Sequence, residues 1–449
     1  MVARRAALAG LVLAALGGSS GRAAEPVPAP PSIPAVLDLD EALRLLRSQG
    51  IDLLIADAAV QSAQGDEAVA GAIPNPLLSG SYGRSRPTHG CTDASGAPAA
   101  CGWMPDGAWT VGLSDQAAIE NTLSGKRSLR VDVARRALEA ARAGRADAQR
   151  ALESQLKQQF VQTLVAGEAL RFATEAEASS ARTAELTRQR FEAGAISEAE
   201  LARIEVAALE AAQARDVAAQ GLADSKAALA FLLGVRGAAP EFDVEGPGFL
   251  RFSEPGRLGS ATAGELLARA QAERPDLQAA RSQRERAAAA LALARRMRFP
   301  DVSVQLGYAQ EGTSATAVTP PTYTVGLSFA LPLLYQQQGE IRKADADLRT
   351  QELGVARLEA QVAQDVRTAV ADYHATSRLA RRMESGLLER AQRARDLVEI
   401  QYRRGAATLL DYLDAQRTFT ATRTEHLQVL QAYWTSVFRL EQAVGEDLR

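Results

Sequence analysis

The chain of 449 residues has few of the side chains that carry most enzyme chemistry. It contains three histidines and two cysteines, and only 5% of its residues are aromatic. His89, His374 and His426 are far apart in the sequence, and no GxxxxGK(S/T), GxGxxG, HExxH or GxSxG motif occurs in a suitable context. We therefore predict no catalytic residues, no cofactor and no metal site, and a protein that is not an enzyme.

An excess of charge of one sign is also missing. The chain has 51 Lys and Arg residues against 54 Asp and Glu residues, which gives a net charge of −3. Proteins that bind nucleic acid usually carry a strongly basic face, and this balance does not indicate one. We therefore expect a folded, well-solvated protein with no nucleic-acid partner.

Long apolar runs are absent from the body of the sequence. No internal segment reaches 18 consecutive apolar residues, so no membrane-spanning helix is predicted, and a membrane crossing would need strands. Residues 1–24 have the pattern of a secretory signal peptide, because Arg4 and Arg5 precede a short apolar run and small residues follow it. We expect export, with cleavage near Ala23 or Ala24.

The only two cysteines, Cys91 and Cys101, lie in a stretch rich in Gly, Pro and Thr. In a chain bound for an oxidising compartment, a local disulfide is the natural prediction, and two free thiols are the alternative. Closing so short a loop would stabilise the fold by about 2.5 kcal/mol if the effect is one of chain entropy. Such a bond would hold a loop without defining the fold.

The second half of the sequence repeats the first, element by element. Residues 38–41 and 262–265 both have the pattern of a capping box, so one helix is expected to open each half. The nearly identical segments WTVGLS, 109–114, and YTVGLS, 323–328, follow at matching places. The predicted organisation is a signal peptide at 1–24, a Pro-rich linker at 25–37, a first repeat at 38–235, a linker at 236–261 and a second repeat at 262–449.

Four segments alternate between apolar residues and small or polar ones, which is the period of a β-strand. Their apolar faces end in Tyr or Trp, as in a membrane β-barrel, although a half-buried soluble sheet gives the same alternation. Four strands cannot close a barrel, and an open edge in lipid is unfavourable. Three copies would supply twelve strands, so we predict a trimer that shares one 12-stranded β-barrel. The four segments are 74–83, 107–115, 300–309 and 322–332.

Each pair of strands is followed by a long stretch without proline that is rich in Ala, Leu, Glu, Gln and Arg, all strong helix formers. A glycine turn interrupts each stretch, so antiparallel helical hairpins are expected at 125–234 and 339–445. Their apolar residues form a packing stripe, and few aromatic residues are available for a globular core. The predicted fold is therefore mainly α, with extended hairpins and a membrane β portion.

This order of elements resembles the TolC-like outer-membrane efflux factor family over about residues 38–445. The most specific matches are the hairpin turns at 190–201 and 401–416, which share an aromatic residue, a glycine three positions later and an acid six positions after that. The resemblance implies a passive outer-membrane exit duct with a periplasmic α-barrel. It also implies a homotrimer in outer-membrane lipid, served by a periplasmic membrane-fusion adaptor and an inner-membrane pump, with an RND-type pump of the heavy-metal branch favoured.

By the same resemblance, acidic side chains at the tips form a ring that closes the tunnel. Asp411 and Asp414, spaced i and i+3, are the candidates for this ring, and Glu200 and Tyr402 are further gate candidates. The alternative for Asp411, and for Glu200, is an ordinary acid that stabilises the start of a helix. The candidates for the hairpin tip and for adaptor docking are Gly194, Ser197, Gly405 and Thr408.

The sequence departs from the family pattern at Ala407. The best-known gate of the family has an arginine at this place, two residues after the second tip glycine, and Arg403 or Arg404 is the substitute that this chain offers. A periplasmic coiled-coil adaptor or scaffold without a pore is the alternative class, and it would explain the helices but not the paired strands. The predicted function is therefore an exit duct for efflux or for type I secretion.

Overall fold

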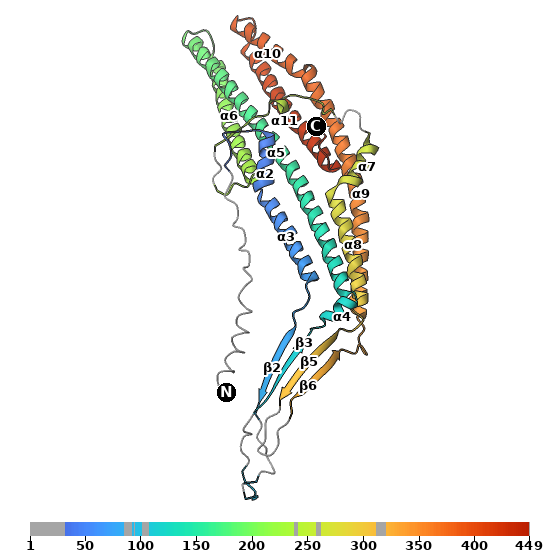
Figure 1. Ribbon diagram of the computed structural model, residues 1–449. Coiled ribbons are helices and arrows are strands. Elements are labelled where there is room, and N and C mark those ends of the chain that lie inside the picture. The colour runs from blue at the N-terminus through green and yellow to red at the C-terminus, as the bar shows by residue number, and fades with distance from the viewer. Residues whose placement is uncertain are drawn as a thin grey trace.

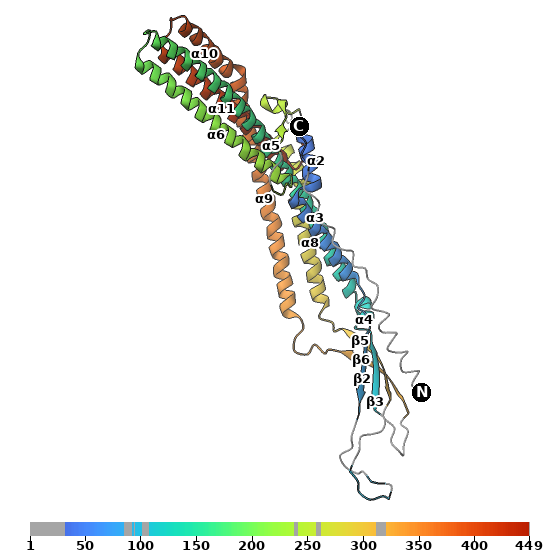
Figure 2. The same cartoon turned by 90° about the vertical axis from the view of Figure 1, so that its left-hand side faces the viewer.

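The stretches rich in Ala, Leu and Glu form the long helices that set the shape of the molecule. The computed structural model describes residues 32–84, 92–93, 95–100, 107–237, 241–256, 262–310 and 320–448. A four-stranded sheet lies at one end, two helical hairpins end in turns at the other, and shorter helices lie between them (Figures 1 and 2). The predicted disulfide partners, Cys91 and Cys101, lie outside the described residues.

The two halves of the chain share one order, two helices, two strands and a long helical hairpin, to which the first half adds β1 and α4. The first half contains β1 (Val36–Leu37), α2 (Leu39–Gln49), α3 (Ile51–Gly71), β2 (Leu77–Gly83), β3 (Ala108–Ser114), α4 (Ala118–Leu123), α5 (Lys126–Glu192) and α6 (Glu198–Leu232). The linker contains β4 (Asp243–Val244) and a 3-10 turn (Pro247–Leu250). The second half contains α7 (Ala263–Glu273), α8 (Pro275–Arg296), β5 (Val302–Gln310), β6 (Thr322–Phe329), α9 (Gln338–Arg382), a π-helical turn (Met383–Leu387), α10 (Leu388–Arg403) and α11 (Leu409–Val444).

Each half opens with two helices instead of the single helix predicted from the sequence. The first break falls at Gly50, with φ −58° and ψ 120°, and the second at Arg274, with φ −63° and ψ 120°. Pro275 disfavours the helical conformation for the residue before it. A Cβ on Gly50 would lie 2.6 Å from the Leu46 carbonyl oxygen. The prediction missed these breaks because a pause of one residue hardly disturbs the apolar periodicity.

The two hairpins differ in their longest helix. α5 runs unbroken over 67 residues, a length of about 100 Å at 1.5 Å per residue. The sequence predicts an equally continuous helix from Gly339 to Tyr402, but the π-helical turn separates α9 from α10, and Gly386 within it has φ 159° and ψ −14°. The prediction of continuity is wrong here, because helix formers on both sides of one glycine give no sign of a π turn. No helix of the described residues is both long and apolar enough to cross a membrane.

The sheet combines strands of both halves of the chain. Its order is β2-β3-β5-β6, and every neighbouring pair is antiparallel. The middle pair joins the halves, since Leu113 of β3 lies opposite Leu306 of β5. The Tyr308 ring lies 4.9 Å from that of Trp109 and 5.2 Å from that of Tyr323. Within the residues that the structure describes, β2 and β6 are edge strands without an outer partner.

A buried lysine fixes the base of the sheet to the helices. The Lys126 ammonium group lies 2.7 Å from a carboxylate oxygen of Asp301 and 3.3 Å from one of Glu120, and it donates a hydrogen bond of 2.7 Å to the Phe299 carbonyl. Lys126 begins α5, whereas Asp301 directly precedes β5. The long helix of the first half is therefore tied to a strand of the second.

Two apolar clusters fill the middle of the molecule, and the linker joins them. One cluster is built mainly from α2, α5 and α6, and the other from α5, α9 and α11. Phe249 of the linker packs against both clusters. Its ring lies 6.2 Å from that of Phe160 and 4.9 Å from that of Trp434. The segment predicted as an aperiodic linker therefore contributes to the core, and its β4 pairs in parallel with β1.

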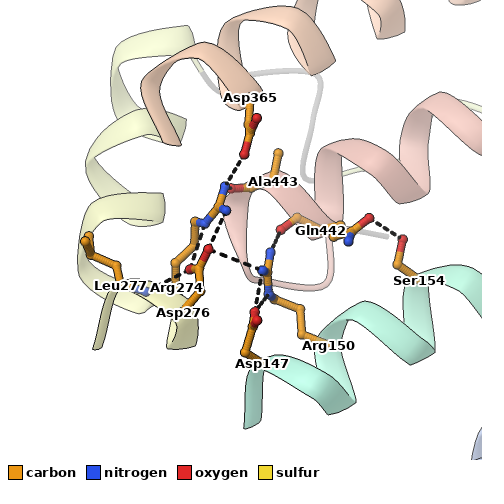
Figure 3. A network of polar contacts seen from close by, with 9 residues as sticks. All are labelled: Asp147, Arg150, Ser154, Arg274, Asp276, Leu277, Asp365, Gln442 and Ala443. Atoms are coloured by element: carbon orange, nitrogen blue, oxygen red, sulfur yellow. Dashed lines mark hydrogen bonds and ion pairs between the residues drawn. The ribbon is translucent and has the colours of Figure 1, made fainter. Parts of the chain in front are cut away.

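Arg274 is the centre of a buried polar network between the helices (Figure 3). Its side chain, only 5% exposed, donates two hydrogen bonds to Asp276, at 3.1 and 2.6 Å. It also donates to the Asp365 carboxylate of α9 at 3.1 Å and to the Ala443 carbonyl near the end of α11 at 3.3 Å. Burial opposes the charge of Asp276, but the bonds from Arg274 outweigh it and hold the pKa of this carboxyl below its usual value.

Arg150 connects α5 to the same network. Its guanidinium donates to the Gln442 carbonyl of α11 and lies 3.7 Å from the Asp276 carboxylate (Figure 3). One turn further along α5, the Ser154 hydroxyl donates to the Gln442 side chain at 3.0 Å. Four helices, α5, α8, α9 and α11, are therefore held together at one point.

We predict that Arg274→Met lowers the free energy of unfolding by about 3 kcal/mol, because it leaves the Asp276 carboxylate largely buried without its main partner. Denaturation of the detergent-purified protein, followed by circular dichroism, would measure the change. The matched control is Arg281→Met, which removes an exposed ion pair of 3.2 Å to Glu359 between α8 and α9. An equal loss in both variants would contradict the special role of Arg274.

Candidate functional site at the hairpin tips

Both long helices end at the tips in the same backbone motif. Gly194 ends α5 with φ 71°; its N–H donates to the Phe191 carbonyl at 2.8 Å, and the Ala195 N–H donates to the Arg190 carbonyl at 2.9 Å. This is a Schellman motif, which needs a left-handed residue and therefore favours glycine. Gly405, with φ 75°, repeats the motif at the end of α10. The glycine turns expected from the sequence are present at both tips.

Each returning helix begins with a capping box. The Ser197 hydroxyl accepts from the Glu200 N–H at 3.3 Å, and the Glu200 carboxylate accepts from the Ser197 N–H at 3.1 Å. Thr408 and Asp411 make the same two bonds, and the Thr408 hydroxyl adds a third to the Asp411 carboxylate at 2.6 Å. The bonds from Thr408, the hydroxyl first and the backbone second, hold the pKa of Asp411 below its usual value. Within one chain, both acids act as helix-start caps.

The two hairpins pack against each other just behind the tips. Within the second hairpin, the rings of Tyr402 on α10 and Tyr412 on α11 stack with their centroids 5.2 Å apart. Tyr412 is buried together with Leu409 of α11 and Ile204 of α6. Its hydroxyl lies 3.3 Å from the Thr183 hydroxyl of α5. Tyr402, a gate candidate from the sequence, therefore lies in the contact between the hairpins.

Arg190 brings a cation to this contact. Its guanidinium lies 5.5 Å from the centroid of the Tyr402 ring, and it belongs to α5 of the other hairpin. Arg403, one of the two substitutes considered for the missing family arginine, instead pairs with Glu399 on its own helix. Sequence reasoning missed Arg190 and Tyr412, because no spacing within one hairpin shows which residues of the other hairpin they meet. Ala407, which stands where the family has an arginine, carries no charge. In this chain a cation–π contact between Arg190 and Tyr402 links the two hairpins instead.

The remaining candidates lie on the surface of the tips. Asp411 and Asp414 are both exposed, one turn apart on α11. The four docking candidates are exposed as well and occupy the outermost turns (Figure 1). A single chain therefore places the acidic residues where they can face other molecules, while Tyr402 and Arg190 hold its two hairpins together.

Long paired hairpins joined to a small sheet define a class of channel-like proteins, and comparison with known sequences identifies the family. The family described as Outer membrane efflux protein matches residues 42–235 and 266–446, one segment in each half. The chain belongs to this family. It is an outer-membrane efflux channel protein, so the resemblance drawn from the hairpin turns is confirmed and the adaptor alternative is set aside.

Two relatives and one solved structure illustrate the similarity. The chain is 28% identical to the cobalt-zinc-cadmium resistance protein CzcC of Cupriavidus metallidurans, over 91% of this chain and 90% of that protein. It is 27% identical to the pyoverdine export outer membrane protein OpmQ of Pseudomonas putida, over 91% and 86%. A crystal structure of CusC matches with a TM-score of 0.74 at 18% identity, covering 96% of this chain and 99% of that one. The predicted fold is therefore confirmed as that of TolC-like channels.

We predict that Arg190→Gln loosens the contact between the hairpins. A cation–π contact at an exposed site contributes about 0.5 to 1 kcal/mol, so amide hydrogen exchange in the second tip should become about two- to fivefold faster. Mass spectrometry of peptides covering residues 398–413 would measure the exchange. Tyr402→Leu also removes the stacking on Tyr412 and should speed exchange at least as much, whereas Arg403→Gln, which removes a pair within α10, should not speed it. Unchanged exchange in Arg190→Gln would rule out the contact.

Proposed function

We propose that three copies of the chain form one passive exit duct, with a shared β-barrel in the outer membrane and a periplasmic α-barrel. The observation that carries this proposal is the pair of edge strands, β2 and β6, which lack outer partners among the described residues. An unpaired backbone group in hydrocarbon costs several kcal/mol, so edges of neighbouring copies have a strong reason to pair. Three four-stranded sheets supply the twelve strands of such a barrel.

The two edges are compatible in direction and in their flanking side chains. β2 and β6 run in opposite directions within the sheet, so β6 of one copy would pair antiparallel with β2 of the next. Residues that follow β6 would then lie beside residues that precede β2. Leu333 and Leu334, after β6, are 77% and 98% exposed, and Ile73, before β2, is 62% exposed. Contact between copies would remove this apolar surface from water.

At the tips we propose a gate in which Asp411 and Asp414 of three copies form an acidic ring. Such a ring favours cations over anions. Glu200 lies in the first turn of α6 and Tyr402 in the last turn of α10. The contact of Arg190 with Tyr402 stabilises the packed arrangement of the hairpins. The exposed turns that carry the docking candidates would receive a periplasmic adaptor. They contain Gly194, Ser197, Gly405 and Thr408.

The cargo we favour is a divalent metal cation, moved by an RND-type inner-membrane pump. The support is the similarity to CzcC, whose name refers to resistance to cobalt, zinc and cadmium. OpmQ, named for export of pyoverdine, is the corresponding argument for a small organic cargo. The sequence contains no nucleotide-binding motif, so the energy would come from the pump and the duct itself would perform no catalytic step.

The trimer makes a specific prediction about crosslinking. In a Cys91→Ser, Cys101→Ser background, Ile73→Cys combined with Leu333→Cys should link three chains under oxidising conditions, because these positions lie at opposite edges of one sheet and meet only between copies. Denaturing gels of membranes would measure the product. Each single cysteine variant is the control and should give no linked trimer. A double variant that remains monomeric would count against the proposed pairing of edges.

The acidic ring predicts ion selectivity. Asp411→Asn with Asp414→Asn keeps the size of both side chains and removes six charges from three copies, so the cation-to-anion permeability ratio should fall about fivefold. Single-channel recording in planar bilayers would measure the ratio. Glu425→Gln, an exposed acid of α11 farther from the tip, is the matched control. Discrete steps with unchanged selectivity would disprove the ring alone, whereas a protein inert in bilayers would overturn the duct.

A further inference from the structure

The second hairpin contains a joint that the first lacks. The π-helical turn at Met383–Leu387 lies between α9 and α10, and Gly386 within it has non-helical backbone angles. The corresponding helix of the first hairpin, α5, has no break. The joint separates the part of the helix that packs in the centre of the molecule from the part that carries Tyr402 to the tip. A change at the joint can therefore move the tip without disturbing the central packing.

The inter-repeat linker holds this joint in place. The backbone N–H of Phe252 donates a hydrogen bond of 2.6 Å to the Glu384 carboxylate, which belongs to the π turn. Glu254 of the linker pairs with Arg381, directly before the turn. The Phe252 ring packs 5.0 Å from that of Tyr433 on α11. The linker thus forms a clasp, residues 252–254, that ties the joint to α11.

His426 of α11 lies beside this clasp in an unusual state. Its side chain is 6% exposed, and neither ring nitrogen has a hydrogen-bond partner in the described structure. The Nε2 atom lies 4.0 Å from the Glu384 carboxylate, which is the same group that accepts from Phe252. A buried polar group without a partner is unfavourable and calls for an explanation.

Arg423 and Glu384 are the two charged groups that act on the imidazole, and further charged residues lie on the elements packed around the joint. Arg423 lies one turn earlier on α11 and pairs with Glu168 of α5 at 2.8 Å. Glu384 belongs to the π turn, and Arg390 of α10 lies against Gly386. The linker contributes Glu254, which is paired with Arg381. Of these groups, Glu384 is the acid placed to form an ion pair with the imidazole when it is protonated.

These surroundings favour the neutral imidazole over the protonated one in the packed arrangement. Burial lowers the pKa of His426, Arg423 lowers it further, and Glu384 partly opposes them. A hydrated imidazole has a pKa of about 6.5, so protonation favours arrangements in which His426 is hydrated or paired. As the pH falls below about 6.5, the ratio of packed to open arrangement falls by up to about tenfold per pH unit. The fall ends at the lower pKa that His426 has in the packed arrangement.

We propose that His426 is a proton-sensitive switch of the joint. The protonated Nε2 draws the Glu384 carboxylate away from the Phe252 amide, which opens the clasp. The segment from the joint to the tip then gains freedom to move, and Tyr402 leaves its contact with the first hairpin. Mild acid thus favours the open duct. This inference rests on the proposed function, because the tip is taken as the gate.

Channel recording between pH 7.5 and 5.5 tests the switch. In the wild-type trimer, the open fraction should rise about fivefold across this interval, with a midpoint below about 6.5. His426→Gln should remove the rise, because glutamine does not titrate. Glu384→Gln keeps an acceptor for the Phe252 amide but no charge, so it should weaken the rise.

His374→Gln is the matched control, since His374 is an exposed histidine on α9 and its variant should respond like the wild type. A rise that persists in His426→Gln, or a wild-type channel that does not respond to pH, would overturn the switch while leaving the duct intact. A protein that conducts at no pH would instead overturn the proposed function.

A second measurement leaves His426 unchanged and needs no conductance. Spin labels at Glu198→Cys on the first tip and Arg403→Cys on the second, in a Cys91→Ser, Cys101→Ser background, report the distance between the hairpins of the assembled protein. Both positions are exposed. The distance should grow between pH 7.5 and 5.5. A constant distance would also overturn the switch.

Discussion

The structure depends on one buried guanidinium, that of Arg274, at the point where four helices meet. A cation in this position must replace its lost hydration with hydrogen bonds, and Arg274 does so with two carboxylates and the Ala443 carbonyl near the end of α11. The planar group directs these partners to different sides, so it helps to fix the relative positions of the four helices. The hairpins extend far from this point, and any error in their angle here would be multiplied at the tips.

Much of the fold could be predicted from the sequence because it depends on interactions between residues that are close together in the chain. The N-cap of Asp38, the capping box at Thr262, the tip glycines and the alternation in the strands each act within a few residues, and all are present. The break before Pro275 and the π turn at Gly386 escaped prediction because they hardly alter the periodicity. The contact of Arg190 with Tyr402 and the partners of Arg274 escaped it for another reason. They depend on how separate helices meet, and no local pattern records that.

The two hairpins occupy matching places in the two repeats but differ in the continuity of their longest helix. The first is built on one continuous helix, and the second on a helix with a π turn held by the linker. The linker packs into both apolar clusters through Phe249 and also holds the joint through Phe252, so it is more than a connection between halves. In the proposed duct, the continuous helix of the first half would keep the wall in shape, and the jointed helix of the second half would let the tip move.

The pairing of β3 with β5 has a consequence for symmetry. A chain with only one repeat could in principle build the same wall from six identical units, but every unit would then carry the same tip. In the proposed trimer, fusing two repeats into one chain reduces the sixfold arrangement to a threefold one, in which alternate tips can differ in sequence. Arg190 on one tip and Tyr402 on the other form a heterologous pair, and the joint can exist in one half alone. In the proposed trimer, duplication followed by divergence would thus convert a uniform ring of tips into one in which fixed and movable tips alternate.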